Sequence, residues 1–127
     1  MRRLAVAAVL AAFSCSAAAE WVIVKDHDEY IAYADPVTIS RAGALAHMSD
    51  LVDLKSPRQS PYGNPHASSK AHSQFDCDNP RMRTTAFSLH SGQMGNGDLV
   101  ETGAISDAWL TVAPGTLLDA LRQFACS

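Results

Sequence analysis

The sequence has no run of like charge and no apolar stretch long enough to cross a bilayer, and these absences exclude several classes of protein. Ten lysines and arginines stand against thirteen aspartates and glutamates, which gives a formal net charge of −3 at pH 7. Without a basic patch, the chain lacks the positively charged surface needed to bind a nucleic-acid phosphate backbone or an anionic membrane. The apolar run at residues 4–13 is well short of the roughly twenty residues that a membrane-spanning helix needs. We therefore exclude a nucleic-acid binder and an integral membrane segment.

The motifs that mark common catalytic sites are also missing. There is no Cys-x-x-Cys pair for redox exchange and no Gly-x-Ser-x-Gly turn for a nucleophilic serine. The segment at residues 92–97 is rich in glycine, but a phosphate-binding loop opens a helix, and here a strand is expected to follow. Asn96-Gly97 is instead a strong hairpin signal. We predict that the protein is not an enzyme and carries no cofactor.

Five histidines and several aspartates invite a metal site, but their spacing does not support one. His66 and His72 are six residues apart, which matches no closed zinc pattern. The three consecutive side chains at residues 26–28 diverge if they lie in a turn. Asp76 and Asp78 flank a cysteine and are an alternative calcium pair, although an ordered calcium site wants six or more oxygens. We therefore predict no metal.

The N-terminal segment, residues 1–19, is typical of a secretory leader. Arg2 and Arg3 precede the apolar run, and small residues at positions 17–19 suit a signal peptidase. Cleavage after Ala19 leaves a single domain at residues 20–127 and changes the net charge to about −5, because both lost charges are arginines. An alternative is lipidation of Cys15, although the residues before it fit a lipoprotein signal poorly.

Only three cysteines occur, and removal of the leader leaves two, Cys77 and Cys126. An even count in an exported protein predicts one disulfide. A bridge closing a loop of about fifty residues contributes roughly 4 kcal/mol in the chain-entropy model.

Short β-rich segments separated by turn residues dominate the rest of the chain. We expect strands at residues 21–25, 29–34, 37–40, 68–77, 81–90, 98–102 and 108–112, and a longer one after residue 43. In that longer strand Ala46, Met48, Val52 and Leu54 share one face, and Asp50 interrupts it, which suggests a bulge. Three prolines, at positions 57, 61 and 65, predict a surface loop over residues 55–67.

A C-terminal helix follows Pro114-Gly115. Thr116 and Asp119 form an imperfect capping box. An apolar stripe at helical spacing follows it, comprising Leu117, Leu118, Leu121, Phe124 and Ala125. Such a helix needs a sheet to cover, so the pattern predicts an α+β fold with the helix on one face of an antiparallel sheet.

The order of several features resembles the surface-adhesin protein E family of exported bacterial proteins. These features are Trp21, Tyr33-x-Asp35, Leu51-Val52-Asp53, Ser69-Lys70, Asp76-Cys77, Arg81, Arg83, the turn at residues 94–97, Trp109, Pro114-Gly115 and Cys126. The resemblance implies a six-stranded antiparallel sheet whose C-terminal helix is held by a Cys77–Cys126 bridge. It also implies adhesion to host extracellular-matrix proteins.

We therefore expect a small exported protein, periplasmic or at the cell surface, that binds another protein. The candidate contact surface is residues 56–68, with Tyr62 and His66 as contact residues, because binding residues concentrate on loops held by rigid scaffolds. The alternative is a soluble periplasmic accessory protein or inhibitor of a cell-envelope enzyme that acts by inserting a loop.

Overall fold

The computed structural model describes residues 19–104 and 107–127. Residues 1–18 of the leader expected at residues 1–19, with the alternative lipidation site at Cys15, lie outside the described residues. Within the described part, no helix has the length and apolar character needed to cross a membrane.

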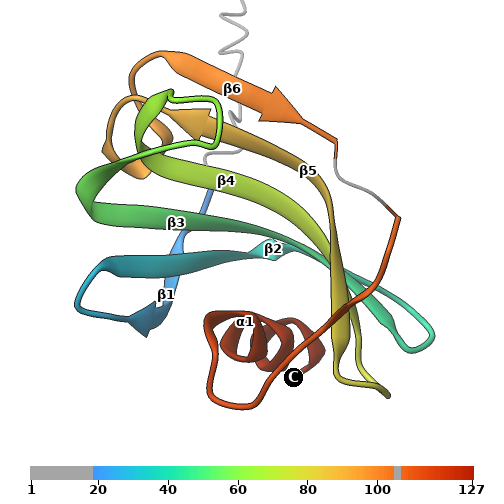
Figure 1. Cartoon of the computed structure of the whole chain (residues 1–127). Helices are drawn as coiled ribbons and strands as arrows, with labels where there is room; N and C mark the ends of the chain where they lie inside the picture. The colour runs from blue at the N-terminus through green and yellow to red at the C-terminus, as the bar shows by residue number, and fades with distance from the viewer. Residues whose placement is uncertain (1–18, 105–106) are drawn as a thin grey trace, which may run out of the picture.

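The described chain forms one antiparallel sheet and one C-terminal helix (Figure 1), which confirms the α+β prediction. Six strands lie in sequence order across the sheet, and a short seventh strand pairs with β5. The elements are β1 (Val22–Asp26), β2 (Tyr30–Ala42), β3 (Leu45–Gln59), β4 (Pro65–Asp76), β5 (Arg81–His90), the 3-10 turn η1 (Gln93–Gly95), β6 (Leu99–Gly103), β7 (Leu110–Thr111) and α1 (Leu117–Cys126). Because each consecutive pair among the first six is antiparallel, short connections suffice throughout.

The expectation of two separate strands at residues 29–34 and 37–40 is wrong, because β2 continues through Asp35-Pro36. The β2–β3 register shifts between Asp35 and Ser40, and side chains there replace the missing backbone pairing. Asp35 Oδ1 accepts from the Val37 backbone amide, and Thr38 Oγ1 accepts from the Ser49 backbone amide at 2.9 Å. Pro36 is tolerated because it lies in this irregular stretch and not in the regular ladder.

The bulge expected at Asp50 is also wrong. Asp50 pairs in register with Ala34 on one side and Ala71 on the other. Its side chain is buried with that of Ser73, which hydrogen-bonds to it. The strand therefore accommodates the polar residue by supplying a partner, and the ladder stays regular.

The expected loop over residues 55–67 is a β-hairpin. β3 extends to Gln59 and β4 begins at Pro65, so only residues 60–64 connect them. The prolines suggested a loop, but each occupies a position that a strand permits. Pro57 lies in a register shift of β3, Pro61 lies in the turn, and Pro65 is the first residue of β4.

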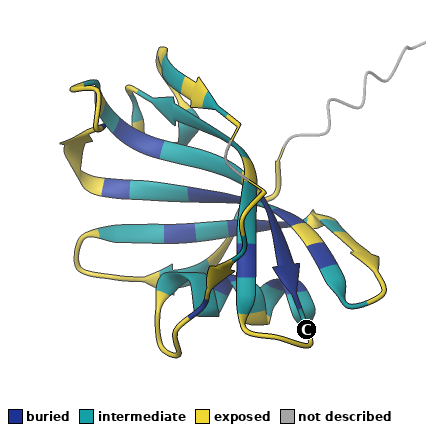
Figure 2. Cartoon of the chain, turned by 45° about the vertical axis from the view of Figure 1, so that its right-hand side comes forward, coloured by how far each residue is buried: buried dark blue, intermediate teal, exposed yellow. Residues whose placement is uncertain are grey.

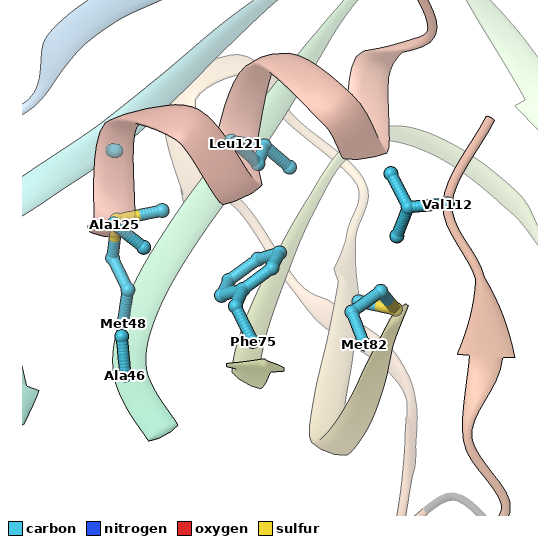
Figure 3. Packing of buried hydrophobic residues seen from close by; sticks show 8 residues of the cluster. Ala46, Met48, Phe75, Met82, Val112, Leu121 and Ala125 are labelled. Atoms are coloured by element: carbon cyan, nitrogen blue, oxygen red, sulfur yellow. The ribbon is translucent and has the colours of Figure 1, made fainter. Parts of the chain in front are cut away.

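The main hydrophobic core lies between α1 and one face of the sheet. Phe75 is fully buried and points toward Leu121 of α1, with Met82 and Val112 beside it (Figure 3). Figure 2 shows the same distribution across the molecule, with buried residues in the central strands and exposed ones at the strand connections. The apolar stripe predicted for the helix is thus confirmed as its packing face.

Two features that the sequence predicted hold α1 in place, one at each end of the helix. Thr116 caps the helix by accepting from the Asp119 backbone amide, and Asp119 Oδ2 accepts from the Gly115 amide. At its other end the Cys77–Cys126 disulfide joins the helix to the residue that follows β4. The predicted bridge is therefore confirmed.

Candidate functional site

The end of the β3–β4 hairpin is a turn held together by one buried side chain. Ser60 Oγ accepts from the backbone amides of Tyr62 and Asn64, each at 3.2 Å. Two backbone hydrogen bonds, from the Ser60 amide to Asn64 and from the Gly63 amide to Ser60, close the same turn. Gly63 has a φ of +80°, which a glycine adopts without strain. Residues 60–64, called the hairpin tip below, therefore form an ordered turn.

Tyr62 projects from the hairpin tip with 86% of its surface exposed. It is more exposed than the other large hydrophobic residues that reach the surface, such as Val37 and Leu99. Because the turn beneath it is already ordered, a partner that covers the ring would lose little entropy in fixing the backbone. This arrangement suits recognition of another protein, in which tyrosine is a favoured anchor.

His66, the second predicted contact residue, lies elsewhere in the hairpin. It is a strand residue of β4, half-buried, and pairs with Arg58 of β3. Its Nδ1 lies 3.4 Å from the Asn64 carbonyl oxygen. The ring therefore helps to support the hairpin tip.

Two exposed ion pairs border the hairpin on the side of the β1–β2 turn. Arg58 pairs with Glu29 at 2.7 Å, and Lys55 pairs with Asp26 at 3.0 Å. These four side chains are about half exposed or more, so each pair stabilises the fold only slightly. They give the surface near the hairpin a mixed charge.

The candidate metal ligands are used for structure. Asp76 is buried and accepts from the Arg81 side chain at 2.8 Å, and also from the backbone amides of Asp78 and Asn79. The Arg81 hydrogen bond holds the pKa of Asp76 well below its usual range. His27 stacks on Tyr30 and accepts from a backbone amide. In residues 19–104 and 107–127 no cluster of three histidine, cysteine or carboxylate side chains is arranged to hold a metal ion.

Three other histidines each pair with a polar side chain on the sheet. The pairs are His47 with Gln74, His72 with Ser49, and His90 with Ser88, at 2.7 to 3.0 Å. Burial, assisted by the charge of Lys70, lowers the pKa of His90. A serine and a histidine in contact are not enough for a nucleophile, which also needs a group to orient the base and donors for an oxyanion.

One cluster was not anticipated from the sequence. The guanidinium groups of Arg81 and Arg83 lie 4.4 and 4.5 Å from the ring centre of Trp109, as in cation–π contacts. Arg83 also donates to Gln74 Oε1 at 2.6 Å. Arg81 and Arg83 are two residues apart on β5 and so share a face of the sheet, but no signal in the sequence placed Trp109 against them.

Comparison with known proteins identifies the fold. The family model described as surface-adhesin protein E matches residues 21–127. A search of curated proteins gives no significant match.

Solved structures of Haemophilus influenzae protein E have a similar architecture. The selenomethionine form superposes with a TM-score of 0.56 at 17% identity, and the match covers 86% of this chain and 92% of that one. A second structure of protein E gives a TM-score of 0.54 at 18% identity, with coverage of 81% and 87%. At this level of identity the similarity establishes a shared fold.

Proposed function

Because the chain belongs to the surface-adhesin protein E family, we propose that it is a non-enzymatic protein-binding module of the bacterial cell envelope, with host extracellular-matrix proteins as its partners. The family supports an exported, adhesin-like protein. The observation that carries the proposal for this chain is Tyr62, which stands almost fully exposed on an ordered turn. Large aromatic residues are normally partly covered, so an exposed one on a fixed support is a fitting contact residue.

The position of the hairpin tip is consistent with this role. In Figure 1 the β3–β4 connection lies at the end of the sheet away from α1. A partner bound there would leave the main core between α1 and the sheet undisturbed. The Ser60 side chain, itself buried, lies within 3.4 Å of Glu101 Oε1 on β6, so the tip is also supported from the neighbouring edge strand.

The binding test compares Tyr62→Ala with wild type on immobilised extracellular-matrix proteins, using residues 20–127. We expect the variant to lose at least tenfold in affinity, or about 1.4 kcal/mol, with no change in unfolding midpoint, because the ring contributes nothing to the core. Val37→Ala is the matched control, since Val37 is 76% exposed on a different part of the sheet. Equal binding by Tyr62→Ala and wild type would show that the binding surface lies outside the hairpin tip.

The location is tested separately by treating whole cells with protease. Digestion of the protein on intact cells is expected for an adhesin. Protection until the outer membrane is breached would contradict contact with host proteins and would favour the alternative, an inhibitor or accessory factor in the periplasm.

A further inference from the structure

The face of the sheet opposite α1 has three adjoining hollows that share His72. The largest, about 510 Å³, is lined by residues of β4, β5 and β6 that include Lys70, Ser88 and Thr102. A second, about 310 Å³, extends past Ser49 on β3. The third, about 270 Å³, reaches Trp21 at the start of the chain's described part and also includes Lys70. Together they form a hollowed strip across the strands, called the polar strip below.

Alternation along the strands explains which polar side chains line the strip. On β4, Phe75 faces the core below α1, so Gln74 and His72 face the other side. On β3, Met48 faces the core, and its neighbour Ser49 lies in the strip. The same alternation that builds the core therefore lines the strip with hydroxyl groups and imidazoles.

The hydrogen-bonding groups of the strip can both donate and accept. Ser49 Oγ lies 2.7 Å from His72 Nδ1, and Ser88 Oγ lies 2.8 Å from His90 Nε2. A serine hydroxyl and a neutral imidazole each offer one donor and at least one acceptor. Such pairs suit a ligand rich in hydroxyl groups, which can donate to one partner and accept from the other.

Lys70 is the strip's source of positive charge. Its side chain is half-buried and packs against Gly95, where a Cβ would collide with the lysine chain. Within residues 19–104 and 107–127 the ammonium forms no hydrogen bond or ion pair. The acidic residues of the third hollow are buried: Asp35 Oδ1 accepts from a backbone amide, and Asp50 contacts Ser73. A fixed, partly desolvated cation without a carboxylate partner favours an anion.

We propose that the polar strip binds an oligosaccharide bearing uronic-acid carboxylates, with one carboxylate at Lys70 in the largest hollow and sugar hydroxyls at the serine–histidine pairs. Trp21, at one end of the strip, offers an aromatic surface for a sugar ring. The strip has one lysine and two buried aspartates on a protein of net negative charge, which fits one carboxylate per disaccharide better than a densely sulfated chain. The lining also contains apolar residues, among them Ala86, Phe87 and Ala104, on which the C–H face of a sugar ring can pack while its hydroxyl groups reach the polar side chains.

The proposal is tested by calorimetric titration of residues 20–127 with a hyaluronan octasaccharide. Lys70→Gln removes the charge and leaves a slightly shorter polar side chain, and we expect at least a tenfold loss of affinity. Lys55→Gln is the matched control, because it removes the same charge from an exposed ion pair outside the strip. We expect that control to bind within twofold of wild type.

Several outcomes would overturn the proposal. One is that wild type gives no heat of binding at millimolar saccharide. Another is that Lys70→Gln and Lys55→Gln lose the same amount of affinity for the saccharide. Tighter binding of a heparin octasaccharide that survives Lys70→Gln would indicate unspecific charge attraction. Binding of an octaglutamate peptide in place of the saccharide would make the strip a peptide site. Tyr62→Ala is expected to bind the saccharide as wild type does, so failure of this proposal is distinguishable from failure of the hairpin-tip proposal.

Discussion

At the scale of single residues, Asp50 is the unusual feature of the core. This residue is only 6% exposed in the middle of β3, and burial raises the pKa of its carboxyl to about 7, although the Ser73 hydrogen bond acts in the opposite direction. In an unfolded chain the same group ionises near pH 4. Between those two values the unfolded state loses a proton that the folded state keeps, so the free energy of unfolding decreases as the pH rises.

Asp50→Asn is expected to remove this pH dependence. The amide is isosteric and can still accept from Ser73, but it has no charge to bury. The variant should therefore match wild type near pH 4 and be more stable at pH 8, by up to about 4 kcal/mol. Urea unfolding at several pH values measures the difference directly. A difference that does not change with pH would show that Asp50 is not the titrating group, and the exposed Asp98→Asn provides a surface control.

At the scale of elements, α1 depends on the sheet for its stability. Ten residues are too few for a helix to persist alone in water. Leu121 is 2% exposed and lies in the cluster that contains Phe75 and Met48. Arg122 adds a second attachment by donating to the Asp76 and Cys77 carbonyl oxygens.

Leu121→Ala is expected to reduce the free energy of unfolding by about 2–5 kcal/mol, because it leaves a cavity below the helix. The midpoint of urea denaturation measures the loss. Gln123→Ala, on the exposed side of the same helix, changes helix composition without touching the core and should cost less than 1 kcal/mol. Equal effects of the two substitutions would contradict packing of Leu121 against the sheet.

The elements that the sequence predicted well are those whose signals are local. The cap at Thr116, the stripe that contains Leu121, and the strand at residues 81–90 all depend on neighbours within a few positions. The β3–β4 hairpin was misjudged because the prolines signal loops locally, whereas the register that accommodates Pro57 depends on the partner strand. The polar strip and the Trp109 stack could not be predicted, since they bring together residues from strands distant in sequence.

At the scale of the whole molecule, one covalent link joins the two layers. Cys77 follows β4 and Cys126 ends α1, with 49 residues of separation. That span contains β5, β6 and β7, so the bridge encloses nearly half of the described fold. Non-covalent contacts at the same corner would persist without it, because Arg122 still reaches the Cys77 carbonyl and Arg41 reaches that of Cys126.

The double variant Cys77→Ser/Cys126→Ser is therefore expected to fold and to be less stable by about 4 kcal/mol, chiefly because its unfolded chain gains freedom. This origin makes a second, independent prediction. An unfolded chain without the crosslink exposes more surface, so the dependence of unfolding free energy on urea concentration should become steeper in the variant. Both quantities come from the same denaturation curves, and reduced wild type should reproduce them. A loss of stability with an unchanged urea dependence of the unfolding free energy would show that the bridge acts through the native contacts of α1. Loss of the fold would show that Arg41 and Arg122 cannot hold the end of the helix without the bridge.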